Sequence, residues 1–227
     1  MIQLAPSVYA ADYIHLGQQL AGMEKQGVTR LHIDVMDGNF VPNLAFGPDF
    51  VAAIRPYTDM DLDVHLMIRE PIRFIKEFSE AGADSVTVHY EACGSLPDTL
   101  DLIGASGLKA GLALKPETSL SVLDADTLGR IQLLQIMSVS PGLKGQHFIP
   151  ESMEKVRNAK QILQRMENNS QVEIEVDGDI TLERLDPLIR AGADILVVGK
   201  GLFAGSLEER LTCYLEQIRQ AGKERAE

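Results

Sequence analysis

Two histidines and two aspartates that suit a divalent metal are spread widely over this chain of 227 residues. They are His32 and Asp34, His65, and Asp177. Imidazole nitrogens and carboxylate oxygens together suit Zn, Fe, Mn or Co, and the ligand types do not choose among these metals. A positioned carboxylate can also move a proton to or from carbon. The residue types therefore point to metal binding and to proton transfer.

Each of these residues lies in a segment of strand-forming residues that a turn former interrupts, at 31–38, 63–67 and 174–178. The side chains should therefore lie at or near the carboxyl ends of strands, where α/β barrels place their active sites. Side chains alternate along a strand, so His32 and Asp34 share one face. Any one of the four alone would more simply be a core histidine or a turn aspartate. Their joint placement favours a functional site.

The rest of the chain alternates between strand patterns and helix patterns. We expect strands at 2–7, 30–35, 62–67, 85–89, 109–114, 133–137, 173–176 and 195–198, and helices at 13–26, 72–81, 151–167, 182–191 and 207–221. This alternation favours a parallel sheet covered by helices, and eight strands allow closure. We therefore predict an α/β fold, a single (β/α)8 TIM barrel over residues 1–227. A doubly wound open sheet is the alternative, but no Gly-x-Gly-x-x-Gly follows the first strand.

The composition of the chain limits the kinds of partner that it is expected to bind. The net charge of −12 repels phosphate backbones, so we expect no nucleic acid partner, and an anionic small substrate would need a local positive site. No apolar run approaches the roughly 18 residues of a spanning helix, and residues 1–7 lack a basic region followed by an apolar core. We therefore expect a cytoplasmic protein without a membrane partner. Two cysteines are too few for a disulfide scaffold.

Two longer segments carry a family resemblance. They read LHIDVMDGNFVPNLAFGP at 31–48 and IMSVSPGLKGQHFIP at 136–150. Both resemble signature segments of the ribulose-phosphate 3-epimerase family. LAPS at 4–7, DVHLM at 63–67 and EVDG at 175–178 follow in the order of that family. The resemblance therefore spans nearly the whole chain.

The resemblance implies a ribulose-phosphate binding barrel that holds one divalent metal through His32, Asp34, His65 and Asp177. It also implies that Asp34 and Asp177 transfer the proton on opposite faces of a ketose phosphate, through a metal-stabilised enediolate. One of the two acids would then rest protonated. The first candidate reaction is D-ribulose 5-phosphate to D-xylulose 5-phosphate. The family also implies a homo-oligomer.

Further residues enter the site by the same resemblance. Ser7 and His65 would contact the substrate, and Met36, Met67 and Met137 would form a polarizable, water-poor floor beneath the reacting carbons. From the residues alone, Ser7 could equally bond the local backbone, and the methionines could simply fill the barrel.

The expected phosphate end departs from the family pattern. The family typically has Gly-Phe-Gly-Gly-Gln, Gly-Gly and Gly-Ser after strands six, seven and eight. The corresponding residues, which we predict to contact the phosphate, are Gly142, Leu143, Lys144, Gly145, Gly178, Asp179, Gly199 and Lys200. Lys144 and Lys200 could add positive charge, whereas Asp179 would repel phosphate unless a lysine neutralises it. Solvated loop residues are the equally simple interpretation.

Three other functions stay open at this point. One is epimerisation of a related ketose phosphate such as allulose 6-phosphate. Another is a decarboxylase of a related phosphate-binding barrel group, although such enzymes need a lysine in an Asp-x-Lys-x-x-Asp strand, where this chain has His65. A third is a non-catalytic sugar-phosphate binding barrel, which the intact set of histidines and aspartates disfavours.

Overall fold

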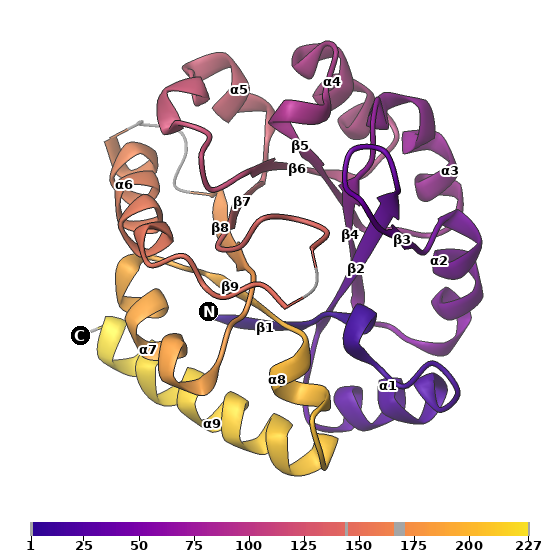
Figure 1. Cartoon of the computed structure of the whole chain (residues 1–227), viewed down its shortest axis with the longest axis vertical. Helices are drawn as coiled ribbons and strands as arrows, with labels where there is room; N and C mark the ends of the chain where they lie inside the picture. Colours follow the sequence, from indigo (N-terminus) through magenta and orange to yellow (C-terminus); the bar gives the residue numbers. More distant parts are fainter. Residues whose placement is uncertain (1, 144, 166–170, 227) are drawn as a thin grey trace.

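The computed structural model describes residues 2–143, 145–165 and 171–226, and these form a closed barrel surrounded by helices (Figure 1). Eight strands pair in parallel in the order β1-β9-β8-β7-β6-β5-β4-β2. A parallel bridge between Ser7 and His32 joins the first and second strands of the ring and closes it. The predicted (β/α)8 barrel is confirmed.

All eight predicted strands form, with ends within two residues of those expected. They are β1 (Gln3–Pro6), β2 (Arg30–Asp37), β4 (Asp61–Met67), β5 (Ser85–His89), β6 (Lys109–Leu114), β7 (Leu133–Met137), β8 (Glu173–Asp177) and β9 (Ile195–Val198). One further strand, β3 (Leu44–Ala45), pairs antiparallel with the end of β2. Two residues are too few to show a periodic pattern, so the sequence did not predict it.

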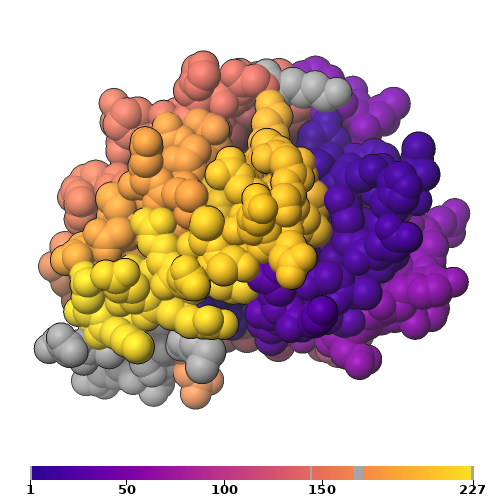
Figure 2. Space-filling view, turned by 90° about the horizontal axis from the view of Figure 1, so that it is seen from below, coloured from indigo at the N-terminus to yellow at the C-terminus, as the bar shows by residue number. Residues whose placement is uncertain are grey.

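The helices cover the outside of the barrel. They are α1 (Leu16–Lys25), α2 (Pro48–Ile54), α3 (Ile75–Glu80), α4 (Leu96–Ala105), α5 (Ala125–Arg130), α6 (Glu151–Arg165), α7 (Leu182–Ala191), α8 (Lys200–Phe203) and α9 (Leu207–Ala226). Those expected near 13–26, 72–81, 151–167, 182–191 and 207–221 are present, and α2, α4, α5 and α8 were not predicted. Figure 2 shows α9, in yellow, beside the indigo N-terminal segment. No described helix has both the length and the apolarity that a membrane span needs.

Alternation along the strands divides the buried side chains into two sets, one beneath the helices and one inside the barrel. On β2, Leu31, Ile33 and Val35 face outward and pack into the main core beneath the helices. The alternate residues of the strand, which include His32 and Asp34, point into the barrel, as the period of two predicts. A small apolar group fills another part of the barrel interior, made of Ala5, Leu133, Ile195 and Val197. The barrel therefore encloses polar side chains that are concentrated around β2, β4 and β8.

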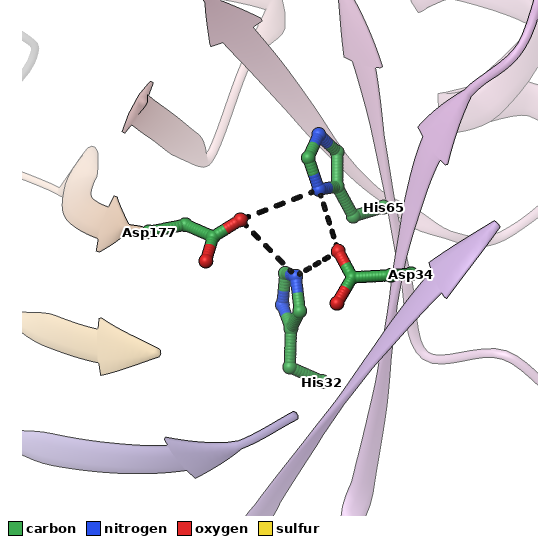
Figure 3. Close-up of side chains that lie close together, drawn as sticks. All are labelled: His32, Asp34, His65 and Asp177. Atoms are coloured by element: carbon green, nitrogen blue, oxygen red, sulfur yellow. Dashed lines mark hydrogen bonds and ion pairs between the residues drawn. The ribbon is translucent and has the colours of Figure 1, made fainter. Parts of the chain in front are cut away.

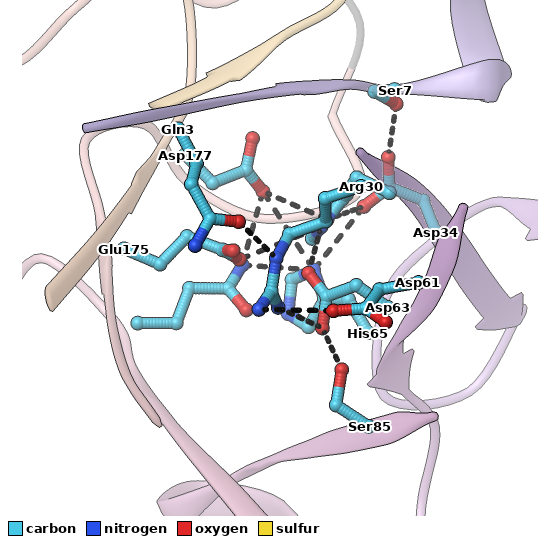
Figure 4. Close-up of polar contacts among 12 residues, drawn as sticks. Gln3, Ser7, Arg30, Asp34, Asp61, Asp63, His65, Ser85, Glu175 and Asp177 are labelled. Carbon is cyan, nitrogen blue, oxygen red and sulfur yellow. Dashed lines mark hydrogen bonds and ion pairs between the residues drawn. The ribbon is translucent and has the colours of Figure 1, made fainter. Parts of the chain in front are cut away.

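A buried arginine lies beneath this polar group. Arg30, at the start of β2, is only 2% exposed, and its Nε donates to Gln3 Oε1 at 3.2 Å. Its guanidinium lies 3.7–3.9 Å from carboxylate oxygens of Asp61, Asp63 and Glu173. Figure 4 labels Arg30 with Asp61 and Asp63. A buried charge is tolerated only when opposite charges and hydrogen bonds compensate it. This network therefore fixes the amino-terminal end of the barrel on which the candidate site rests.

Candidate metal and proton-transfer site

The four residues selected from the sequence meet inside the barrel (Figure 3). One ligand atom from each of His32, Asp34, His65 and Asp177 lies within 4.8 Å of the other three. Parallel pairing places Asp34 directly opposite His65, and His32 lies two residues earlier on the same face of β2. Asp177 reaches the group from β8 across the barrel. The register of β2 with β4 and the closure of the barrel thus bring together residues that are up to 145 positions apart.

Both histidines turn one nitrogen toward the same carboxylates. Asp34 Oδ1 lies 3.3 Å from His32 Nε2 and 3.2 Å from His65 Nδ1, and Asp177 Oδ2 lies 3.9 and 3.7 Å from these two nitrogens. The two imidazoles are fully buried. Two carboxylates and two ring nitrogens around one point require a positive charge there, which a metal ion or bound protons supply.

His32 is oriented by a second carboxylate. Its Nδ1 lies 2.9 Å from Asp63 Oδ2, so Nδ1–H donates and Nε2 faces the cluster. Among the described residues, His32 Nε2 has no hydrogen-bond partner. Burial lowers the pKa of His32, but Asp34, Asp63 and Glu175 together outweigh burial and raise this pKa well above its ordinary value. A buried imidazole that donates from one nitrogen to a carboxylate and leaves its other nitrogen unpaired is suited to bind a metal.

The two aspartates of the cluster differ in acidity. Burial raises the pKa of Asp34, but His32 and His65 outweigh burial and hold this pKa well below its ordinary range. Burial, followed by the charge of Asp34, raises the pKa of Asp177 to about 7. Neighbouring acids whose pKa values are driven apart can serve as base and acid in one reaction.

Two further polar side chains, Gln135 and His89, contact the cluster, and Glu91 contacts His89 in turn. Gln135 Nε2 donates to Asp177 Oδ2 at 3.2 Å and lies 3.1 Å from His65 Nδ1. On its other side, His65 Nε2 lies 2.9 Å from Nε2 of His89, whose Nδ1 lies 3.2 Å from Glu91 Oε2. Burial lowers the pKa of His89 to about 4. The sequence favoured a structural role for His89, and its contact with His65 was not predicted.

Sequence reasoning also missed the residues beneath the cluster. Asp63 and Glu175 lie two positions before His65 and Asp177, so the same period of two would have placed them in the barrel. Asp63 accepts from Ser85 Oγ at 2.6 Å (Figure 4), and Glu175 Oε1 lies 3.4 Å from His32 Nδ1. Burial, followed by the charge of Asp63, raises the pKa of Glu175 well above its ordinary value.

A cavity of about 870 Å³ opens above the cluster. Of the predicted residues, those that line it are Ser7, Asp34, Met36, Met67, Met137, Gly142, Leu143, Gly145, Asp177, Asp179, Gly199 and Lys200. His65 and Gly178 are buried behind this lining. Lys144 lies outside the described residues. The cavity is of the size that small-molecule sites usually have, and it connects the two carboxylates with the three expected phosphate loops.

Ser7 lies between β1 and the cluster. Its Oγ donates to Asp34 Oδ2 at 2.7 Å (Figure 4). The hydroxyl therefore bonds Asp34 rather than the local backbone, which was the alternative that the sequence left open.

Asp179 has a different partner from the one that the sequence suggested. Its carboxylate pairs with Arg184 at 2.9 Å and accepts from the backbone N–H of Phe148 at 3.1 Å. The expectation of repulsion unless a lysine neutralises the charge therefore needs correction, because an arginine five residues later does so. Asp179 has a φ of 50°, in the left-handed region. The preceding Gly178 has a φ of 126°, and a Cβ there would lie 2.6 Å from Val139.

The barrel and its cluster place the protein among the (β/α)8 proteins that carry polar, ionisable side chains at the carboxyl ends of their strands, where enzymes of this fold have their active sites. The model of the "Ribulose-phosphate 3 epimerase family" matches residues 3–203. The ribulose-phosphate 3-epimerase of Bacillus subtilis is 43% identical over 206 residues, which cover 91% of this chain and 94% of that protein. That of Chlamydia muridarum is 43% identical over 202 residues, which cover 89% and 88%. The chain belongs to the ribulose-phosphate 3-epimerase family and is an isomerase, as the resemblance implied.

A solved structure supports the fold independently. The 3-keto-L-gulonate-6-phosphate decarboxylase of Vibrio cholerae superimposes with a TM-score of 0.68 at 17% identity, over 97% of each chain. At this identity the likeness shows the barrel alone. It gives no support to the decarboxylase alternative, whose lysine is replaced here by His65.

Proposed function

We propose that this protein is a metal-dependent 3-epimerase of a ketose phosphate, and that it interconverts D-ribulose 5-phosphate and D-xylulose 5-phosphate. One observation carries the proposal: Asp34 and Asp177 face the same cavity with pKa values shifted in opposite directions. The relatives named ribulose-phosphate 3-epimerase, about 40% identical over nearly the whole chain, support this substrate.

The cluster fits a divalent metal ion. His32 Nε2, Asp34 Oδ1, His65 Nδ1 and Asp177 Oδ2 would hold it. This set of two nitrogens and two oxygens suits Zn, Fe, Mn or Co. When bound, the ion would stabilise the negative charge that develops on the oxygen atoms of the substrate during proton transfer.

The two aspartates would perform the proton steps. One carboxylate takes the proton from C3, which breaks the C–H bond and leaves an enediolate, and the other returns a proton to the opposite face of C3. In one direction, the acidic Asp34 is suited to begin as the base, and Asp177, with its raised pKa, is suited to begin as the acid. Their roles exchange in the reverse reaction. The hydrogen bond from Ser7 would hold Asp34 in position.

Apolar side chains would keep water from the reacting carbons. Met36, Met67 and Met137 line the cavity and are each no more than 6% exposed. Their thioethers are polarizable and do not compete for protons. Exclusion of water strengthens electrostatic interactions with the developing charge.

The phosphate would bind at the other end of the cavity. Gly142, Gly145 and Gly199 line the cavity and carry no side chain of their own over the backbone, and Lys200 offers positive charge. Asp179 adds little repulsion there, because Arg184 pairs with it.

We further propose that the protein is a homo-oligomer that acts in the cytoplasm and has no membrane partner. We also propose that it has no nucleic acid partner, in keeping with the net charge of −12.

The proposal can be tested with the wild-type protein and a panel of phosphorylated and free ketoses. In deuterated water, D-ribulose 5-phosphate should be epimerised and gain deuterium at C3, because the removed proton exchanges with solvent. Allulose 6-phosphate and free ribulose should react more slowly. Faster turnover of allulose 6-phosphate would change the substrate, and epimerisation without C3 labelling in either direction would count against the two-acid mechanism.

A further inference from the structure

Two buried imidazoles and a partly exposed carboxylate form a chain that begins at His65 and leads away from the cavity. His65 Nε2 lies 2.9 Å from His89 Nε2, and His89 Nδ1 lies 3.2 Å from Glu91 Oε2. The two imidazoles come from the neighbouring strands β4 and β5, and both are 0% exposed. Glu91 follows in the short turn after β5. Among the described residues that line the cavity, neither His89 nor Glu91 is present, so neither would touch the substrate.

Glu91 fixes the direction of the hydrogen bonds in this chain. Its Oε1 already accepts from the backbone N–H of Lys115 at 2.9 Å and from the hydroxyl of Thr118. Its Oε2 then accepts from His89 Nδ1–H. A neutral His89 with its proton on Nδ1 has a lone pair on Nε2, so His65 must donate to it from Nε2. His65 Nδ1 is then left with its lone pair.

The contacts on the opposite side of His65 do not by themselves decide its tautomer. Gln135 Nε2 donates to Asp177 Oδ2 at 3.2 Å, which orients its amide, and this NH2 group lies 3.1 Å from His65 Nδ1. An amide nitrogen donates and does not accept, so Gln135 favours a lone pair on His65 Nδ1. Asp34 Oδ1 also lies 3.2 Å from this nitrogen and, as an acceptor, favours a proton on it in the absence of a metal. The contacts on this side therefore allow either tautomer, and the hydrogen bonds from Glu91 through His89 decide between them.

We propose that Glu91, acting through His89, is a positioning residue that fixes the tautomer of His65 and thereby presents the Nδ1 lone pair to the metal. The inference rests on the metal site of the proposed function. In metal sites, groups hydrogen-bonded to the far nitrogen of a ligating histidine set its tautomer and its basicity. His32 has the equivalent partner in Asp63, directly rather than through a second imidazole.

A purely structural role for Glu91 would be to hold the turn at Lys115–Thr118. That turn has a separate anchor, because Lys155 Nζ donates to the carbonyl oxygens of Lys115 and Thr118, both at 2.6 Å, and to that of Pro116. The turn should therefore survive a substitution of Glu91 that keeps its size.

Glu91→Gln gives the sharpest test. The N–H of Lys115 can only donate, so the carbonyl oxygen of the new amide should face it and the NH2 group should face His89. His89 would then carry its proton on Nε2, and His65 would be forced to carry its own on Nδ1, in the metal position. Nitrogen-15 NMR of the imidazoles in the metal-free protein should show His65 with Nε2–H in the wild type and with Nδ1–H in the variant. The dissociation constant for Co²⁺, measured by titration, should rise about 10- to 100-fold.

Glu24→Gln is the matched control. Glu24 Oε1 also accepts from a backbone N–H, that of Asp59 at 2.7 Å, and from a threonine hydroxyl, that of Thr58 at 2.6 Å. No histidine is bonded to it in the described structure. This variant should leave both the tautomer of His65 and the dissociation constant for Co²⁺ unchanged.

A second pair of variants decides the matter if Glu91→Gln does not fold, which thermal unfolding of the metal-free protein would reveal. His89→Gln offers His65 a carbonyl oxygen as acceptor and should keep Co²⁺ affinity close to that of the wild type, whereas His89→Leu offers none and should weaken it about tenfold. Equal affinities in these two variants would overturn the proposal. So would an unchanged His65 tautomer in a folded Glu91→Gln protein, or a switched tautomer with unchanged affinity. Failure of the wild type to bind Co²⁺ would instead refute the metal site. The NMR measurement of the His65 tautomer would still show whether Glu91 acts on His65 through His89.

Discussion

The two ends of the cavity are built differently. At the metal end, His32, Asp34 and His65 lie within β2 and β4, are at most 6% exposed, and are held by buried hydrogen bonds. At the expected phosphate end, the residues lie in the loops after β7 and β8 and at the junction of β9 with α8, and several are exposed, as for Leu143 at 47%. Strands hold the groups that would perform the chemistry, and loops hold those that would select the substrate.

This difference implies different tolerances to substitution. A change at the metal end leaves a buried charge or lone pair without a partner, which is costly, whereas a change on a loop is compensated in part by water. We therefore expect substitutions at the metal end to abolish chemistry or metal binding, and those at the phosphate end to shift KM. Four predictions test this comparison.

The largest effect is expected at the two acids. Asp34→Asn and Asp177→Asn should each lower kcat by several orders of magnitude, because each removes one of two carboxylates that must exchange a proton with C3. The remaining acid should still exchange the proton on its own face, which NMR of the substrate in deuterated water would detect. Near wild-type epimerisation by either variant would refute the mechanism and remove the distinction between the two ends.

The next effect concerns metal content. We expect about one divalent metal per chain in the purified protein, and a lower content in His32→Ala and His65→Ala, because each loses one of four ligands. Elemental analysis after dialysis against a limited amount of chelator would measure this. Lys200→Ala, at the phosphate end, serves as the control and should keep its metal. Full retention in both histidine variants would mean that the metal is held elsewhere.

The same difference explains what the sequence could predict. The convergence of His32, Asp34, His65 and Asp177 could be anticipated, because strand period and parallel register convert sequence spacing into position. Extending that period by two residues would also have found Asp63 and Glu175. The tautomer chain could not be found this way, because it depends on which nitrogen of each imidazole faces its neighbour.

The loops were less predictable for a physical reason. Asp179 bonds the backbone of Phe148, 31 residues away, in a loop whose path no periodic pattern describes. Its left-handed backbone, and its pairing with Arg184 rather than with a lysine, follow from that loop conformation. The sequence led to a prediction of which residues form the expected phosphate end, but it did not predict the partners of these residues.

A smaller effect is expected at Lys200. If its ammonium contacts the phosphate, Lys200→Ala should raise KM for the ketose phosphate with little change in kcat. A buried charge-assisted contact contributes on the order of 1.5–3 kcal/mol, and an exposed lysine contributes less, so we expect a rise of less than about tenfold. Lys109, at the other end of the barrel on β6, gives a matched control, and Lys109→Ala should leave KM unchanged. If Lys200→Ala has no effect and a free ketose reacts as fast as its phosphate, the phosphorylated substrate must be abandoned.

The smallest effect tests whether Arg184 neutralises Asp179. In Arg184→Ala the carboxylate of Asp179 is no longer paired and would repel the phosphate, so KM should rise by about threefold, within the range of an exposed ion pair of less than about 1 kcal/mol. Removing both groups in Arg184→Ala/Asp179→Gly should return KM toward the wild-type value, because glycine also adopts the left-handed backbone of Asp179 without strain. Asp179→Gly alone should then improve phosphate binding only slightly, since its charge is already balanced. A marked fall in KM for that single variant would show that Asp179 acts as an unbalanced charge, and the phosphate end would then be defined by repulsion as well as by open backbone.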